Sequence, residues 1–273
     1  PDIGDLFARL RADQDDVEGG SSPAPASSRP SPAGRRPTRR PGAVSDADEA
    51  VLQRRDAALG GIDEQLSRRL KRALQDEQNL VLDRLRTHRD RLTAAAVLGL
   101  PGERIAFYRE TARPFLEEAA RAGASSAPLG TVPIAVDDLA TELAGELCTA
   151  LAQRVERVLA DPLDEAPVAP PGRSSGPGPL LAERIGSVYR DWKVHRAEAV
   201  AVHYLVAAFE RGAYVARPEG APLRWVNGDV EACPDCDDNT LAGPTPRGQP
   251  FPTGQAHPPA HPGCRCSLAP AAY

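Results

Sequence analysis

Four of the five cysteines in this 273-residue chain lie in two short segments near its C-terminal end. Cys233 and Cys236 form a Cys-x-x-Cys pair, and Cys264 and Cys266 form a Cys-x-Cys pair. Two such pairs, separated by a loop, match the number of ligands in a closed tetrahedral zinc site. The sequence therefore predicts one structural Zn²⁺ ion bound by thiolates.

Histidines beside the second cysteine pair widen the set of candidate ligands. His261 precedes Cys264 by three residues, and His257 lies four residues before His261. In the simplest ligand set the four cysteines bind the ion and His261 donates a hydrogen bond to the site. In the alternative set His261 replaces Cys264 or Cys266. His257 is less suited as a ligand because two prolines stiffen the chain directly after it.

The segment around the cysteines has too few apolar side chains to fold unaided. It offers Trp225, Val226, Leu241, Phe251 and Leu268. A bound zinc ion contributes on the order of 10 kcal/mol to the folding of such a module. Disulfide bonds between the cysteine pairs are the alternative, but no secretory context is visible in the sequence and reduced thiols are therefore favoured.

A catalytic zinc site is a further interpretation of the cluster. A zinc deaminase needs His-x-Glu ahead of its Pro-Cys-x-x-Cys, whereas His195 and Glu198 have His-x-x-Glu spacing. His195 and His203 are eight residues apart, which does not fit the His-Glu-x-x-His motif. The cluster also supplies enough protein ligands to leave no position for water. The sequence favours a non-enzymatic protein over a zinc hydrolase or deaminase.

The zinc module is expected to follow a largely helical chain, because alanine, leucine and arginine dominate the composition. We expect a short amphipathic helix at 1–18 and a helical or coiled-coil region at 46–160. Residues 180–273 should form a long helix, a short β-hairpin with an Asn-Gly turn, and the irregular zinc knuckle. Two Pro-rich segments, 19–45 and 161–179, are expected to be disordered linkers between the ordered parts. The predicted fold class is mainly α with a small zinc knuckle.

A narrow apolar stripe marks the region 46–160. Its members recur at intervals of three, four or seven residues: Leu59, Ile62, Leu66, Leu70, Leu74, Val81, Leu85 and Leu92. This spacing is close to a heptad seam and predicts a coiled coil or helical hairpin that pairs with itself or with a partner. The helix is expected to run to about Leu98, with Gly60-Gly61 as a candidate break.

Two further helices are expected in the same region, at about 103–122 and 137–160. Pro114 is expected to kink or delay the first helix. Cys148 lies on the apolar side of the second helix and is interpreted as a core residue without a functional role.

Charge and composition narrow the range of partners. The net charge of −5 provides no global basic field for nucleic acid, so nucleic acid is a candidate partner only through the arginines of residues 29–40. The longest apolar run, at about 199–209, is too short for a membrane span, and no motif for a small-molecule substrate is evident. The chain begins at Pro1 and has no Met, so we expect a processed or truncated, cytoplasmic product.

The segments "LRWVNGDVEACPDCDDNTLAG" and "GQPFPTGQAHPPAHPGCRCSLAP" carry a resemblance. They resemble the C-terminal signature of the phage Mu F-like minor head proteins, a head-morphogenesis family. The matching positions are Trp225, Cys233, Cys236, Phe251, Pro259, His261, Pro262, Cys264, Arg265 and Cys266. The resemblance covers roughly residues 180–271, and Arg196-Ala197-Glu198 is similar to a helical motif of the family.

The resemblance implies a few-copy capsid component that associates with portal or capsid-like proteins and is virion-associated if the gene comes from a phage. The helical region before residue 161 resembles, more faintly, actinobacterial coiled-coil proteins that act as scaffolds in polar growth or division. The sequence therefore predicts a phage- or prophage-derived minor head protein with a structural zinc site. The alternative is a host coiled-coil scaffold that carries the zinc module for partner binding.

Overall fold

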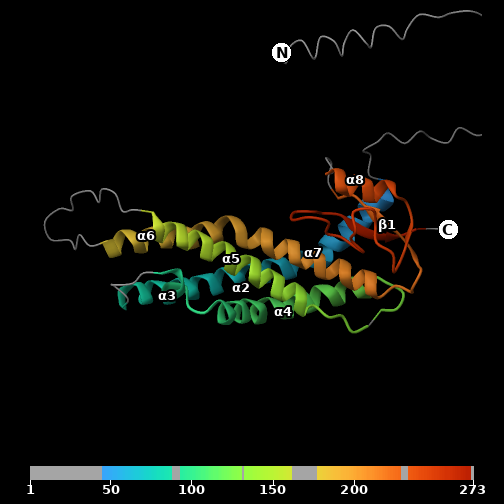
Figure 1. Cartoon of the computed structure of the whole chain (residues 1–273). Helices are drawn as coiled ribbons and strands as arrows, with labels where there is room; N and C mark the ends of the chain where they lie inside the picture. The colour runs from blue at the N-terminus through green and yellow to red at the C-terminus, as the bar shows by residue number, and fades with distance from the viewer. Residues whose placement is uncertain (1–44, 88–92, 131, 162–176, 229–232, 272–273) are drawn as a thin grey trace, which may run out of the picture. The chain divides into compact units, whose positions relative to one another are not determined.

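The computed structural model describes residues 45–87, 93–130, 132–161, 177–228 and 233–271 (Figure 1). The predicted helix at 1–18, nearly all of the 19–45 segment and residues 162–176 of the second segment lie outside this part. The helices are α2 (Asp46–Thr87), α3 (Ala94–Leu98), α4 (Pro101–Ser125), α5 (Asp137–Ala160), α6 (Pro177–Asp191), the π-helix η1 (Trp192–Arg196), α7 (Ala197–Val215) and α8 (Pro234–Leu241). The strands are β1 (Pro222–Val226), β2 (Thr245–Pro246) and β3 (Ser267–Pro270). The mainly helical class is confirmed.

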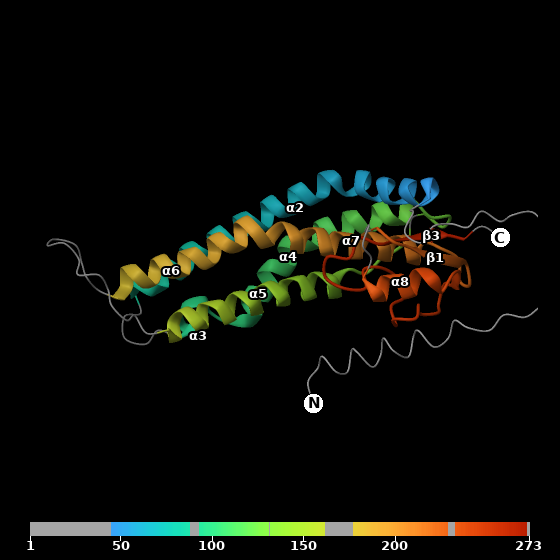
Figure 2. The same cartoon turned by 90° about the horizontal axis from the view of Figure 1, so that it is seen from above.

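The helices α2 to α7 form a bundle around one hydrophobic core. Helix α4 packs against α2, α5 and α7, and α2 also packs against α6 and α7, as the view from above shows (Figure 2). The fully buried Leu70, Leu116, Leu147 and Leu205 belong to the same core cluster. The expectation of separate ordered parts on either side of residues 161–179 is therefore wrong, because helices from both sides bury their apolar faces against each other. Residues 177–179 of that segment are the first turn of α6.

The apolar stripe of α2 is covered within the chain. Six of its members are at most 6% exposed and lie in the bundle core: Leu59, Ile62, Leu66, Leu70, Leu74 and Val81. Leu85 is partly buried against the same core, and Leu92 lies outside the described residues. The stripe was predicted as a coiled-coil seam, but α4, α6 and α7 occupy it. Its burial requires no second chain.

Helix boundaries differ from the sequence expectation at α2. Gly60 and Gly61 do not break α2, which runs through both residues and on to Thr87. A separate short helix, α3, begins after Thr93, whose side chain accepts a hydrogen bond from the Ala96 N–H at 3.2 Å. It ends at Gly99, whose φ of 86° favours glycine.

The two later helices agree more closely with the prediction. Pro101 occupies the first turn of α4. Its missing N–H costs no hydrogen bond there, because N–H groups of the first turn have no acceptor within the helix. Pro114 lies inside α4, which continues to Ser125, so it does not end the helix. Helix α5 has the predicted bounds, and Cys148 is confirmed as a buried core residue, 3% exposed. No helix in the described ranges is long and apolar enough to cross a membrane.

A buried polar network joins α2 to α4 inside the bundle. The Glu77 carboxylate forms an ion pair with Arg104 and accepts a hydrogen bond from the Tyr108 hydroxyl at 2.7 Å. Arg104 also donates to the backbone carbonyl of Cys148 on α5 at 3.4 Å. Burial, followed by the nearby Glu77 charge, raises the pKa of Tyr108 far above its usual range. The network fixes the relative position of three helices.

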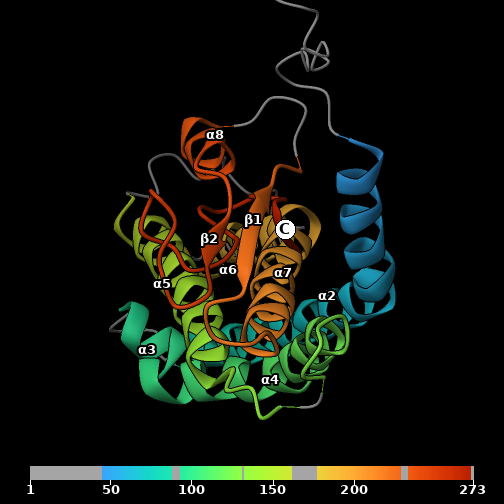
Figure 3. The same cartoon turned by 90° about the vertical axis from the view of Figure 1, so that its right-hand side faces the viewer.

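The strands form a three-stranded antiparallel sheet in the order β2-β1-β3. The predicted hairpin across Asn227-Gly228 is not the pairing that forms. Strand β1 pairs instead with the distant β3, where Trp225 lies opposite Leu268, and with the short β2. Figure 3 shows β1, β2 and α8 near one end of α7. Residues 222–271, as far as they are described, are called the knuckle below.

Candidate metal centre

The knuckle has a small core in which cysteines replace the apolar side chains of an ordinary domain. Leu223, Trp225, Phe251 and Leu268 are at most 3% exposed. The rings of Trp225 and Phe251 meet edge to face, with centroids 5.1 Å apart. The remaining buried members of this core are Cys236, Cys264 and Cys266. The thiols thus occupy the centre of the knuckle.

The Cys-x-x-Cys pair lies at the start of α8. Cys233 is the N-cap of this helix, and Pro234 occupies its first turn. Proline favours this position because its fixed φ is already close to the helical value. The Cys233 sulfur accepts a hydrogen bond from the Cys236 N–H at 3.4 Å. One helix turn therefore brings both sulfurs to the same side.

The Cys-x-Cys pair follows a tight turn. The Cys264 N–H donates to the His261 carbonyl at 3.1 Å, and Gly263 has a φ of 81° that favours glycine. Cys266 is the last residue before β3. The turn carries His261 and Cys264 toward α8, and pairing of β3 with β1 fixes the position of Cys266.

The structure brings all five predicted ligands together. The Nε2 atom of His261 lies 3.0 Å from the Cys233 sulfur and 3.4 Å from the Cys236 sulfur. The Cys236 and Cys264 sulfurs are 3.7 Å apart. The ligand atoms form two overlapping groups, Cys233–Cys236–His261 and Cys236–Cys264–Cys266, each with its atoms within 4.8 Å of one another. Cys236 belongs to both groups and lies at the centre of the cluster.

Two of these separations are close to those around a tetrahedral zinc ion. With Zn–S bonds of about 2.3 Å and Zn–N bonds of about 2.0–2.1 Å, neighbouring sulfurs should be about 3.8 Å apart and a sulfur and nitrogen about 3.6 Å. The Cys236–Cys264 and Cys236–His261 distances, 3.7 and 3.4 Å, are close to these values, whereas the Cys233–His261 distance of 3.0 Å is shorter. The four cysteines are free thiols in the structure. Soft thiolate ligands with one imidazole favour zinc over the hard cations Mg²⁺ and Ca²⁺.

The orientation of the His261 ring suits a ligand. Its Nδ1 atom lies 2.9 Å from the Pro262 carbonyl oxygen, an acceptor that requires a proton on Nδ1. The lone pair is then on Nε2, the atom that faces the two sulfurs of the Cys-x-x-Cys pair. A backbone carbonyl that fixes the tautomer of a histidine in this way is a common feature of zinc sites.

Cys266 has a different environment from the other cysteines. It is fully buried, and its thiol donates toward the Asn227 side-chain oxygen at 3.8 Å. A hydrogen bond from Cys266 lowers the pKa of the Cys264 thiol to about 5, whereas the same contact and burial raise the pKa of Cys266. Cys264 is therefore the more readily ionised thiol of this pair.

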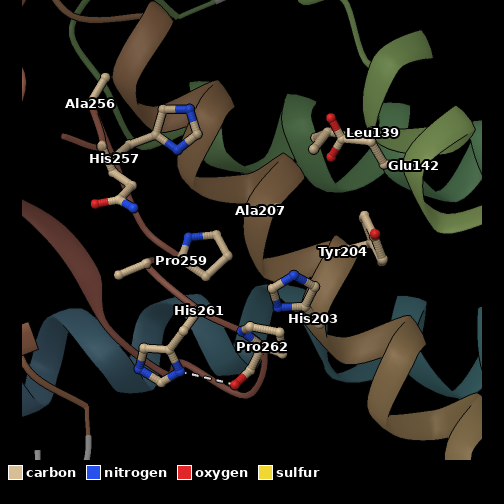
Figure 4. A pocket seen from close by; sticks show the side chains of 12 residues that line it. Leu139, Glu142, His203, Tyr204, Ala207, Ala256, His257, Pro259, His261 and Pro262 are labelled. Carbon is tan, nitrogen blue, oxygen red and sulfur yellow. Dashed lines mark hydrogen bonds between the residues drawn. The ribbon is translucent and has the colours of Figure 1, made fainter. Parts of the chain in front are cut away.

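The other histidine and glutamate candidates lie outside the cluster. The Nδ1 atom of His257 lies 2.8 Å from the Pro258 carbonyl oxygen, and the centroid of its ring lies 5.5 Å from that of Tyr214. It lines a pocket of about 400 Å³ together with His203 and His261 (Figure 4). His195 is exposed on η1, and Glu198 lies 3.9 Å from the Lys71 ammonium group. Neither His257, His195 nor Glu198 belongs to the groups of metal ligands found in the described ranges.

Two buried charged residues that the sequence did not single out attach the knuckle to the bundle. Arg55 of α2, 2% exposed, donates to the carbonyl oxygens of Arg265 and Cys266 at 2.7 and 2.9 Å. Glu210 of α7, fully buried, accepts hydrogen bonds from the Ser267 hydroxyl and from the Leu268 N–H at 2.9 Å. The contacts of Arg55 span 210 and 211 residues of sequence, so no local pattern reveals them.

Comparison of the chain with family models, with curated proteins and with solved structures gave no match. The metal centre and its attachment to the bundle are therefore the features from which a function can be inferred.

Proposed function

We propose that the chain is a non-enzymatic assembly protein whose knuckle is held together by one structural Zn²⁺ ion. The ligands in this proposal are Cys233, Cys236, Cys264 and His261. In this set Cys266 lies beside the site without binding the ion, and its thiol donates toward the Asn227 side-chain oxygen. The orientation of His261 and the distinct surroundings of Cys266 favour this set over one made of four cysteines.

The observation that carries the proposal is the convergence of the five candidate ligands in the core of the knuckle. Cys236, Cys264 and Cys266 are at most 3% exposed. A catalytic zinc ion keeps one coordination position open to water or substrate, whereas this cluster offers more protein ligands than one ion needs. The role that fits is stabilisation of a small module with few apolar residues.

Metal analysis tests the zinc site directly. Protein purified without added metal is expected to contain one zinc ion per chain, and X-ray absorption should show three sulfurs and one nitrogen around it. Cys266→Ser should keep the zinc ion and His261→Ala should lose it or bind it more weakly. The reverse result would support the four-cysteine set, and a chain purified without zinc would overturn the proposal.

The role that we propose for the chain is that of a phage- or prophage-derived minor head protein acting at the portal. The spacing and residue types shared with the Mu F-like signature support this role, as does the close packing of the knuckle on a helical bundle. The bundle would hold the knuckle in one orientation toward a partner surface. In this proposal the partner is a portal or capsid-like protein, with the chain associated with the virion.

Co-expression tests this role. The genes beside this one are expected to encode a portal protein and a terminase. The zinc-loaded chain should sediment with that portal protein, and Cys236→Ser should not, because its knuckle is no longer held in shape. A chain that sediments alone under both conditions would contradict the assignment while leaving the zinc site in place. The alternative of a host coiled-coil scaffold draws less support, because the bundle itself covers the apolar stripe of α2.

A further inference from the structure

A second pocket lies at the seam between the bundle and the knuckle, apart from the cysteine cluster. It has a volume of about 420 Å³ and is lined by residues of α2, α4, α7 and β3. Arg217, just after α7, is part of its lining. The pocket therefore exists only where the knuckle is docked on the helices.

Arg217 is a buried cation with no hydrogen-bond or ion-pair partner for its side chain among the described residues. Its side chain is 7% exposed, and its Nε atom is buried without a hydrogen-bond acceptor. The guanidinium forms no ion pair within the described part of the chain. Burial lowers the pKa of Arg217, and the charge of nearby Glu210 offsets this only in part. A guanidinium buried in this way is costly unless an anion accepts its hydrogen bonds.

The other buried polar side chains around the pocket already have hydrogen-bond partners. Arg55 donates to two carbonyl oxygens and to the Asp56 carboxylate. Both oxygens of Glu210 accept hydrogen bonds from β3. The hydroxyls of Ser125 and Ser126 donate to carbonyl oxygens of α4 at 2.7 and 2.6 Å. Arg217 is thus the buried donor that remains for a ligand, and the exposed Arg54 lies at the same pocket.

The walls of the pocket are largely apolar. Val51 of α2, Phe209 of α7 and Leu268 of β3 contribute side chains to it. The buried guanidinium of Arg217 balances a single negative charge, whereas a phosphate dianion would need a second buried cation, and Arg54 is exposed to solvent. Apolar walls around one buried cation favour a monocarboxylate that carries an apolar body.

We propose that this pocket binds a small organic monocarboxylate, with the carboxylate on Arg217 and the apolar body against Val51, Phe209 and Leu268. Such a ligand would contact both the bundle and the knuckle. Its binding would therefore stabilise the docked arrangement, by mass action on the state in which the pocket exists. This site is separate from the zinc ligands and does not depend on the proposed role at the portal.

The probe is hexanoate, titrated into the zinc-loaded chain at constant ionic strength, with binding followed by the methyl NMR signals of Val51 and Leu268. Hexanol and inorganic phosphate are titrated in parallel. Hexanoate is expected to shift these signals saturably, with hexanol and phosphate binding at least about tenfold more weakly. If hexanol binds as tightly as hexanoate, the pocket recognises only the apolar body. If phosphate binds as tightly as hexanoate, the pocket recognises only the negative charge. Either result, or no shift with hexanoate, overturns the proposal.

Two variants assign the binding to this pocket. Arg217→Gln should weaken hexanoate binding at least about tenfold, whereas Arg121→Gln, the same change at an exposed position of α4, should leave it unchanged. Val51→Trp fills the pocket from α2 without altering an arginine and should also abolish binding, which covers the case in which Arg217→Gln fails to fold. Unchanged binding in Val51→Trp would place hexanoate elsewhere and refute the assignment.

Discussion

Gly123 of α4 and Gly212 of α7 lie where the backbones of these two helices come into contact. A Cβ atom added to Gly123 would lie 1.9 Å from the carbonyl oxygen of Phe209, and one added to Gly212 would lie 1.9 Å from that of Ala120. No side chain fits at either position unless the helices move apart. Because Glu210 and Arg217 flank this crossing in sequence, it also sets the position of the groups that meet the knuckle.

Gly123→Ala or Gly212→Ala is expected to lower the free energy of unfolding by about 3 kcal/mol, the upper part of the usual range for overpacked cores. The matched control is Gly145→Ala in α5, where an added Cβ meets nothing within 4 Å. That change should raise stability by about 0.5–1 kcal/mol, since alanine is the better helix former. Urea unfolding of the three variants measures both effects. A Gly123→Ala variant as stable as Gly145→Ala would contradict the close crossing.

The attachment of the knuckle gives a second prediction. Arg55→Ala removes the donor to the Arg265 and Cys266 carbonyl oxygens, and should cost about 3 kcal/mol because hydrogen bonds to charged groups contribute about 1.5–3 kcal/mol each. The loss should appear as faster amide exchange in β3 and faster release of zinc to a chelator. Arg69→Ala, at an exposed position of the same helix, is the control. Equal zinc release in both variants would show that Arg55 does not hold the knuckle.

Sequence patterns predicted what depends on local spacing. The bounds of α5 and the core position of Cys148 follow from residues near one another in the chain. The meeting of the two cysteine pairs with His261 was predicted from residue types and spacing, although Cys236 and Cys264 are 28 residues apart. The partner of the α2 stripe did not follow, because a heptad-like stripe has the same pattern whether α4 and α7 or a second chain covers it. The pairing of β1 with β3 was also missed. An Asn-Gly sequence favours a hairpin locally, but the cysteine cluster and Glu210 bring β3 to the edge of β1.

The buried polar network of the bundle gives a third prediction. Glu77→Gln removes the charge that Arg104 requires, and leaves an uncompensated buried guanidinium. The expected loss is about 3–5 kcal/mol in the free energy of unfolding. Glu110→Gln, at an exposed site of α4, should change stability by less than about 1 kcal/mol. In the double variant Glu77→Leu/Arg104→Met, much of the loss should be recovered, because no buried charge is left unpaired. A double variant as unstable as Glu77→Gln would argue against this account.

A fourth prediction concerns pH. Burial raises the pKa of Glu210 to about 7, although hydrogen bonds from Ser267 and Leu268 act in the opposite direction. The folded chain therefore holds this proton to a higher pH than the unfolded chain, so the stability contributed by Glu210 falls as pH rises from about 4.5 to about 7. Burial lowers the pKa of His203 and His257. These two residues therefore make the stability rise with pH below about pH 6.5, opposite to the effect of Glu210.

The measurement is therefore a difference between two proteins. The free energy of unfolding of the wild-type chain minus that of Glu210→Gln should decrease between pH 5.5 and 7.5, because the histidines and the zinc site contribute equally to both. The expected change is on the order of 2 kcal/mol. A difference that stays constant over this range would mean that Glu210 is ionised throughout.

The two tryptophans of the chain allow the role of zinc to be read separately in each region. Trp192 is buried in the bundle core and Trp225 in the knuckle core, at 2% and 1% exposure. Cysteines make up three of the seven buried residues of the knuckle core, so without zinc this core retains only four apolar side chains.

Chelation, or Cys233→Ser, should therefore unfold the knuckle and shift the emission of Trp225 to longer wavelength. The bundle core contains no predicted zinc ligand, so Trp192 should keep its buried emission. Fluorescence of the Trp192→Phe and Trp225→Phe variants, before and after chelation, isolates each signal. If Trp225 stays buried after zinc is removed, the apolar residues, Arg55 and Glu210 are sufficient to fold the knuckle, and the metal has another role.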